Sequence, residues 1–171
     1  MKHAIFYIAL VMAFVSRNDV NGQASEKKDK SAQKKEDYQK VLSIIESGKY
    51  EFDAQKANPQ RGRQIDLTTN PGFLRINNGH ARADLPYMGV AQTAPYSGDV
   101  GIKFDSEATS YKVTKNEKKN KITVTFKVNS KGESFNCTLS IAGGTGNASL
   151  YIISTRRDSI SYYGVVSELK E

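Results

Sequence analysis

The chain has 171 residues, of which 25 are basic and 18 acidic, so its formal charge is +7, and it contains one cysteine. A lone cysteine excludes a framework of internal disulfides, so the fold has to be stabilised by its core. The basic residues are scattered rather than gathered in one stripe, which argues against nucleic acid as a partner.

The N-terminus has the parts of a secretory signal peptide. Lys2 and His3 precede twelve apolar or aromatic residues, 4–15, and small residues lead to a predicted cleavage site after Ala24. Twelve apolar residues are too few to span a bilayer, which needs about 20. We therefore expect residues 1–24 to be removed, no transmembrane segment to remain, and the mature protein to be secreted across the inner membrane, to the periplasm or the cell surface.

A charged segment follows the predicted cleavage site. Residues 25–37, SEKKDKSAQKKED, contain no large apolar side chain and are predicted to form a flexible tether. Behind it, four apolar residues share the spacing of one helical face: Tyr38, Val41, Leu42 and Ile45. Gly48 is suited to end such a helix. We expect a short amphipathic helix that ends near Ser47 and belongs to a single β-rich domain, residues 38–171.

From Tyr50 onward, apolar and polar residues alternate, which is typical of half-buried strands. In two segments the predicted inward positions are Ile122, Val124, Phe126 and Val128, then Phe135, Cys137, Leu139 and Ile141. Further strands are predicted at 50–57, 100–104, 110–114, 148–155 and 160–166. One flat layer could not bury these faces. The predicted fold is therefore mainly β, an antiparallel β-sandwich or partly open barrel with one short N-terminal amphipathic helix.

The segment RINNGHAR predicts a hairpin, because Asn78-Gly79 suits a two-residue turn with positive φ at both central positions. The turn predicts these cross-strand pairs: Asn77 with His80, Ile76 with Ala81, Arg75 with Arg82, Leu74 with Ala83, and Phe73 with Asp84. Two arginines directly opposite one another repel unless a carboxylate or an outside anion lies between them.

A long connection follows the hairpin, and its residues carry a family resemblance. The stretch DLPYMGVAQTAPYSGDVGIKF, 84–104, read with FDAQKANPQRG at 52–62, GFLRINNGHARADL and the ending NASLYIISTRRDSISYYG, resembles bacterial secreted proteins of the domain of unknown function 4251 family. The resemblance covers about residues 37–166, although Met88 stands where the family usually has an aromatic residue. It implies an exported, strand-rich domain of the cell envelope. It implies no activity and identifies no site residue.

The same connection contains the candidate ligand-binding residues. Pro86 and Pro95 prevent it from continuing a central strand. Its tyrosines have two interpretations: they cap the core in a stiff crossover that closes one end of the fold, or they form the aromatic rim of a pocket. On the second interpretation, the ligand-binding residues are an apolar rim and two contacts for an anionic group: Tyr87, Met88 and Tyr96, with Arg75 and Arg82.

Few residues are suited to catalysis. Cys137 is predicted to be a buried apolar thiol, because its neighbours in the alternation are apolar. His80 with Asp84 is a minimal acid–base pair, but the sequence places no serine or cysteine for it to activate, and a hydrated, salt-bridged sheet face explains both residues. The other histidine, His3, lies in the signal peptide, so we expect no metal site and no cofactor.

These patterns favour an exported, non-catalytic binding module of the bacterial cell envelope, with a small ligand or an envelope partner. Two alternatives stay open. One is a small hydrolase that uses His80 and Asp84. The other is a purely structural envelope component that associates through an exposed strand edge.

Overall fold

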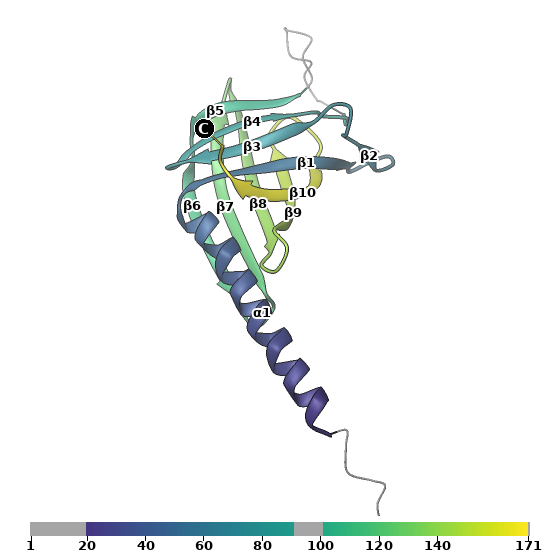
Figure 1. Ribbon diagram of the computed structural model, residues 1–171. Coiled ribbons are helices and arrows are strands. Elements are labelled where there is room, and N and C mark those ends of the chain that lie inside the picture. Colours follow the sequence, from purple (N-terminus) through teal and green to yellow (C-terminus); the bar gives the residue numbers. More distant parts are fainter. Residues whose placement is uncertain (1–19, 91–100, 171) are drawn as a thin grey trace, which may run out of the picture. The chain divides into compact units, whose positions relative to one another are not determined.

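The computed structural model describes residues 20–90 and 101–170, with side chains from residue 32 onward (Figure 1). The apolar stretch of the predicted signal peptide and Tyr96 lie outside the described residues. No helix among the described residues is long and apolar enough to cross a membrane. The chain divides into two compact units, Met1–Gln33 and Lys34–Glu171, and the second contains every described strand.

The helix α1, Val20–Glu46, is much longer than the sequence predicted. The four predicted apolar positions near its C-terminal end are buried and belong to the core, and the helix ends one residue before Ser47. Residues 25–37 are helical, so the prediction of a flexible tether is corrected there. Their lysines, glutamates, glutamine and alanine are good helix formers, and a helix already formed adds residues more easily than it nucleates. The side chains of residues 32–36 are exposed.

The strands run antiparallel to their neighbours in one ten-stranded sheet. They are β1 (Lys49–Pro59), β2 (Ile65–Asp66), β3 (Gly72–Asn77), β4 (His80–Leu85), β5 (Ile102–Glu107), β6 (Thr109–Asn116), β7 (Lys121–Ser130), β8 (Glu133–Ala142), β9 (Asn147–Ser154) and β10 (Ile160–Glu168). Only the two-residue β2 has no counterpart among the predicted strands. The order across the sheet is β5-β4-β3-β1-β10-β9-β8-β7-β6, and β2 pairs with β1.

The sheet curls into a partly open barrel, which confirms the predicted fold class. Its two edge strands, β5 and β6, are separated in the chain only by Ala108, so the sheet returns towards its own start. Near this seam, the hydroxyl of Ser106 in β5 donates to the carbonyl of Asn129 in β7 at 3.2 Å. The single curved sheet therefore encloses the core, as two facing sheets do in a sandwich.

The core fills the inside of this barrel. Every predicted inward residue of β7 and β8 is at most 2% exposed. Fully burying one such large side chain contributes about 1.5–3 kcal/mol to stability. Cys137 is among these residues, and burial raises the pKa of its thiol to about 12. The prediction of a buried apolar thiol is confirmed.

The predicted hairpin is confirmed in every pair. Asn78 and Gly79 have φ values of 50° and 89°, as a two-residue turn of this kind requires. β3 and β4 pair in the predicted register, from Asn77 with His80 to Phe73 with Asp84. The sheet thereby presents Arg75, His80, Arg82 and Asp84 on the face opposite the core.

Candidate functional site

The segment after β4 is held against β10 and the β9–β10 connection by two tyrosines. The Tyr162 hydroxyl donates to the carbonyl of Pro86 at 2.8 Å. The Tyr87 hydroxyl donates to the carbonyls of Val90, at 2.9 Å, and Asp158, at 3.2 Å. The Tyr87 side chain is buried, and burial, with a smaller contribution from Asp158, raises the pKa of its hydroxyl. Tyr87 therefore caps the core, as the first interpretation has it, and it also lines the pocket described below.

A buried ion pair lies beside Tyr87. Arg157 Nε donates to Glu133 Oε1 at 2.9 Å, and Nη2 donates to Oε2 at 3.1 Å. The third nitrogen, Nη1, donates to the carbonyl of Gly101 at 3.0 Å, and the hydroxyl of Ser154 donates to Glu133. The two charged side chains are only 10% and 9% exposed. The guanidinium carbon lies 5.4 Å from the centre of the Tyr87 ring. The pair joins β8, the β9–β10 connection and the start of β5.

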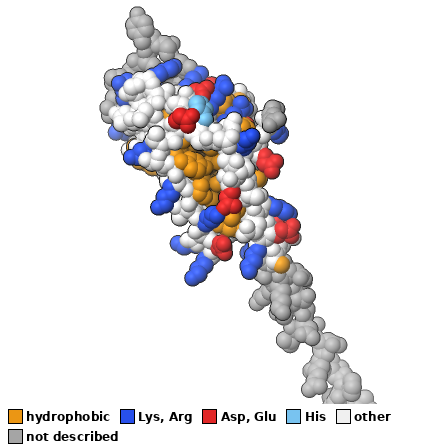
Figure 2. Space-filling view, turned by 90° about the vertical axis from the view of Figure 1, so that its left-hand side faces the viewer, with side chains coloured by type: hydrophobic (Ala, Val, Ile, Leu, Met, Phe, Trp, Pro, Cys, Tyr) orange, Lys and Arg blue, Asp and Glu red, His pale blue; other side chains and the backbone are white. Residues whose placement is uncertain are grey.

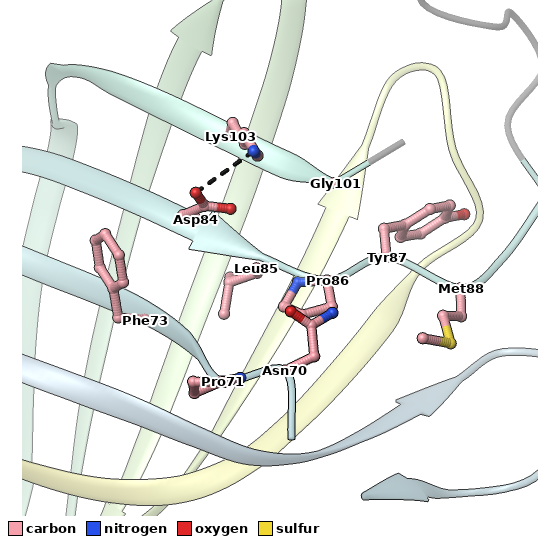
Figure 3. A pocket seen from close by; sticks show the side chains of 10 residues that line it. All are labelled: Asn70, Pro71, Phe73, Asp84, Leu85, Pro86, Tyr87, Met88, Gly101 and Lys103. Atoms are coloured by element: carbon pink, nitrogen blue, oxygen red, sulfur yellow. Dashed lines mark ion pairs between the residues drawn. The ribbon is translucent and has the colours of Figure 1, made fainter. Parts of the chain in front are cut away.

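An open pocket of about 400 Å³ lies next to this cap (Figure 3). Residues of β3, β4, β5 and the segments before β3 and after β4 line it: Asn70, Pro71, Phe73, Asp84, Leu85, Pro86, Tyr87, Met88, Gly101 and Lys103. On one wall, Lys103 Nζ lies 3.5 Å from Asp84 Oδ2, as drawn in Figure 3. The pocket therefore combines two aromatic rings, two prolines and a methionine with the Lys103–Asp84 ion pair. Its volume is within the range of sites for small ligands.

The structure brings together only part of the predicted ligand-binding set. Tyr87 and Met88 line the pocket, and the Met88 side chain is 47% exposed. Arg75 and Arg82 are not among the lining residues, and Tyr96 lies outside the described residues.

The two arginines of the hairpin instead turn to carboxylates on flanking strands. Arg75 hydrogen-bonds through two nitrogens to Glu51 of β1, at 2.9 and 3.1 Å, and lies 4.3 Å above the Phe73 ring. Arg82 Nε lies 3.7 Å from Asp105 Oδ2 of β5. The expected repulsion is therefore relieved by a separate carboxylate for each arginine.

Phe73 and Lys103 line the pocket although neither was predicted to do so. Phe73 was recognised only as a hairpin partner. Lys103 stands directly opposite Asp84 across β4 and β5, which are separated by a long connection. The register of such a distant pair cannot be derived from a turn motif. Asn70-Pro71, just before β3, is the one local signal, because it is a typical turn dipeptide.

His80 pairs with Asp105 and Glu107 rather than with Asp84, so the alternative of a His80–Asp84 acid–base pair is corrected. His80 Nε2 lies 2.5 Å from Asp105 Oδ1, and Nδ1 lies 3.4 Å from Glu107 Oε1. Residues four apart in a strand are separated by about 13 Å, whereas cross-strand neighbours are adjacent. Figure 2 shows a histidine beside acidic side chains at the surface, above a band of hydrophobic ones. This arrangement is a salt-bridged sheet face.

The His80 contacts predict a pH dependence. The hydrogen bond to Asp105, followed by that to Glu107, raises the pKa of His80 above 6.5. A raised pKa in the folded state means that the stabilisation is complete below the unfolded value and is lost as pH rises through the folded value. We expect an NMR titration of the imidazole protons to give a pKa above that of a free histidine. Asp105→Asn is expected to lower this pKa more than Asp84→Asn; equal effects would contradict the contacts.

Among the described residues, no group of three His, Cys, Asp or Glu side chains is arranged to hold a metal ion. The charged cluster around His80 consists of ion pairs with Asp105 and Glu107. The pocket beside Tyr87 is the better candidate for binding.

Comparisons with known proteins support the fold and assign no activity. The family model described as a domain of unknown function, DUF4251, matches residues 32–166. A crystal structure of a DUF4251 family protein from Bacteroides eggerthii DSM 20697 is similar, with a TM-score of 0.59 and 19% sequence identity. The match covers 77% of this chain and 87% of that one. No curated protein matches the chain.

Proposed function

Because the chain belongs to the DUF4251 family, whose description assigns no activity, we propose a function from its own site. The protein is an exported, non-catalytic binding module of the bacterial cell envelope, and it takes a small ligand in the pocket beside Tyr87. The observation that carries this proposal is the combination of apolar rings and one ion pair around a space of about 400 Å³.

The lining residues favour a ligand with an apolar body and charged ends of both signs. Phe73, Pro86 and Met88 offer apolar surface. Asp84 and Lys103 are 52% and 45% exposed, so a ligand ammonium can approach the carboxylate while a ligand carboxylate approaches the Lys103 amine. A short peptide with apolar side chains has these features. We therefore propose peptide-like zwitterions as the ligand class.

Two further features support a binding role in the envelope. The Cys137 thiol is buried and has a raised pKa, so it is unsuited to nucleophilic attack. The N-terminal sequence has the three parts of a signal peptide, which supports export. Cell fractionation tests the second point, and retention of the full-length protein in the cytoplasm would contradict it.

The ligand proposal is tested with leucyl-phenylalanine as the probe, followed by amide NMR spectra of the labelled protein. We expect the peptide to shift resonances of residues 70–73, 84–88 and 101–103. Lys103→Met is expected to weaken binding about tenfold, which corresponds to about 1.4 kcal/mol. Arg82→Met is the matched control, since Arg82 lies on the same outer face but does not line the pocket.

Shifts confined to other residues, or equal weakening by Lys103→Met and Arg82→Met, would overturn the assignment of the pocket.

A further inference from the structure

The outer face of β7–β10 contains a block of eight residues with hydroxyl groups, which we call the hydroxyl face. Strand pairing places four of them in one row across the sheet: Thr125, Thr138, Tyr151 and Ser161. The neighbouring row on the same face is Thr123, Ser140, Ser149 and Tyr163. Every position of both rows across these four strands is therefore serine, threonine or tyrosine.

These hydroxyl groups are available to a ligand. The rings of Tyr151 and Tyr163 are 41% and 42% exposed, and the other six residues are half-buried. Within the described part of the chain, none of the eight hydroxyls hydrogen-bonds to another protein group. Each hydroxyl can donate one hydrogen bond and accept others, so the face presents donors and acceptors together.

The hydroxyl face has no charged side chain at its eight positions, whereas the outer face of β4 and β5 is strongly charged. There the outward residues are His80, Arg82, Asp84, Lys103, Asp105 and Glu107. Lysines border the face, where Lys112 of β6 pairs with Thr125 and Lys56 of β1 pairs with Tyr163. A charged group laid on the eight positions themselves would lose hydration without a charged partner among them. The face is therefore matched to a neutral ligand that is rich in hydroxyl groups.

We propose that the hydroxyl face binds a neutral polysaccharide. Sugar hydroxyls both donate and accept, like those of serine and threonine, and the C–H face of a sugar ring packs on an aromatic ring. Tyr163 pairs with Ser149, two residues along β9 from Tyr151, so the two tyrosines are diagonal neighbours. Such neighbours lie about 7–8 Å apart, which lets one extended chain contact both rings. Ile153, exposed two residues beyond Tyr151, extends the apolar surface.

This surface is separate from the pocket beside Tyr87, so the two proposals fail independently. The test is affinity electrophoresis of the mature protein in native gels that contain hydroxyethylcellulose, galactomannan or amylopectin, with polygalacturonate as the anionic comparison. We expect at least one neutral polysaccharide to retard the protein, and the dissociation constant to change less than about twofold between 0.05 and 0.5 M salt, because charge screening has little to act on.

Two variants locate the binding. The double variant Tyr151→Ala/Tyr163→Ala removes both rings and is expected to weaken binding at least about tenfold. Thr138→Lys keeps both rings and places a charge in the centre of the face, so it is expected to weaken binding as well. It tests the location of the binding surface even if the double variant does not fold. Lys103→Met, in the pocket, is the control and is expected to bind normally.

Several outcomes would overturn the proposal. They are retardation by no neutral polysaccharide, retardation by polygalacturonate alone with strong salt dependence, and unchanged retardation of both hydroxyl-face variants. A wild-type dimer that both variants dissociate, without any polysaccharide binding, would assign the face to self-association instead.

Discussion

Replacing Arg157 with methionine is expected to lower the free energy of unfolding by about 3–5 kcal/mol. Methionine keeps most of the apolar stem but removes the guanidinium. The Glu133 carboxylate then stays buried and, among the described residues, keeps only its hydrogen bond from Ser154. The carbonyl of Gly101 also loses a donor. Urea unfolding followed by circular dichroism measures the change in the midpoint at constant slope.

Arg75→Met is the matched control for this prediction. Arg75 and Arg157 each lie 2.9 Å from a carboxylate oxygen, but the Arg75 side chain is 41% exposed and the Arg157 side chain is 10% exposed. Because water reaches the Arg75 side of the pair, although Glu51 is only 14% exposed, its loss is expected to cost less than the loss of Arg157. The double variant Glu133→Leu/Arg157→Met leaves no unpaired buried charge and is expected to recover part of the lost stability. Equal losses of unfolding free energy for Arg75→Met and Arg157→Met would show that burial does not set the strength of the Arg157–Glu133 pair.

Replacing Gly164 with alanine is expected to destabilise the protein by about 3 kcal/mol or more, at the upper end of overpacking costs. A Cβ atom on Gly164 would lie 1.8 Å from the carbonyl oxygen of Asp53 and 2.8 Å from its carbonyl carbon. The obstacle is the backbone of β1, where the pairing with β10 shifts register between Ala54 and Lys56. The clash can therefore be relieved only if β1 and β10 move apart.

Gly144→Ala is the matched control for Gly164→Ala. The nearest atom to a Cβ atom on Gly144 is Nδ2 of Asn120, at 3.2 Å, which is the end of a flexible side chain. Its cost is expected to stay below about 1 kcal/mol. Thermal unfolding of both variants measures the difference, and similar melting temperatures would refute the close approach of β10 to β1.

The sequence predicted the strands well because their signals are local. Alternation marks which side chains of β7 and β8 face the core, and burial depends on that alternation alone. The register of β3 and β4 follows from Asn78-Gly79, since a two-residue turn leaves one way to pair the residues on either side. The helix was predicted at its buried end, where Tyr38 to Ile45 have a period of 3.6. Residues 25–37 have no apolar period, so the pattern predicted no helix there.

The candidate site was predicted less well, because its residues meet across long separations in the chain. Tyr87 and Met88 were selected for their place in a rigid aromatic connection, and both line the pocket. Arg75 and Arg82 were assigned to a ligand, yet each has a carboxylate partner on a strand that no local motif pairs with β3 or β4. His80 was matched with Asp84, and its partners come from β5.

By itself, the sequence determined the strand periodicity, the hairpin and the mainly β class, since each depends on residues a few positions apart. The tertiary structure alone decided that the strands form one curled sheet, that Arg157 and Glu133 are buried together, and that eight hydroxyl residues share one outer face. The physical reason is that cross-strand neighbours are set by the order and register of strands distant in the chain. That order depends on how the whole core closes, and no short stretch of residues specifies it.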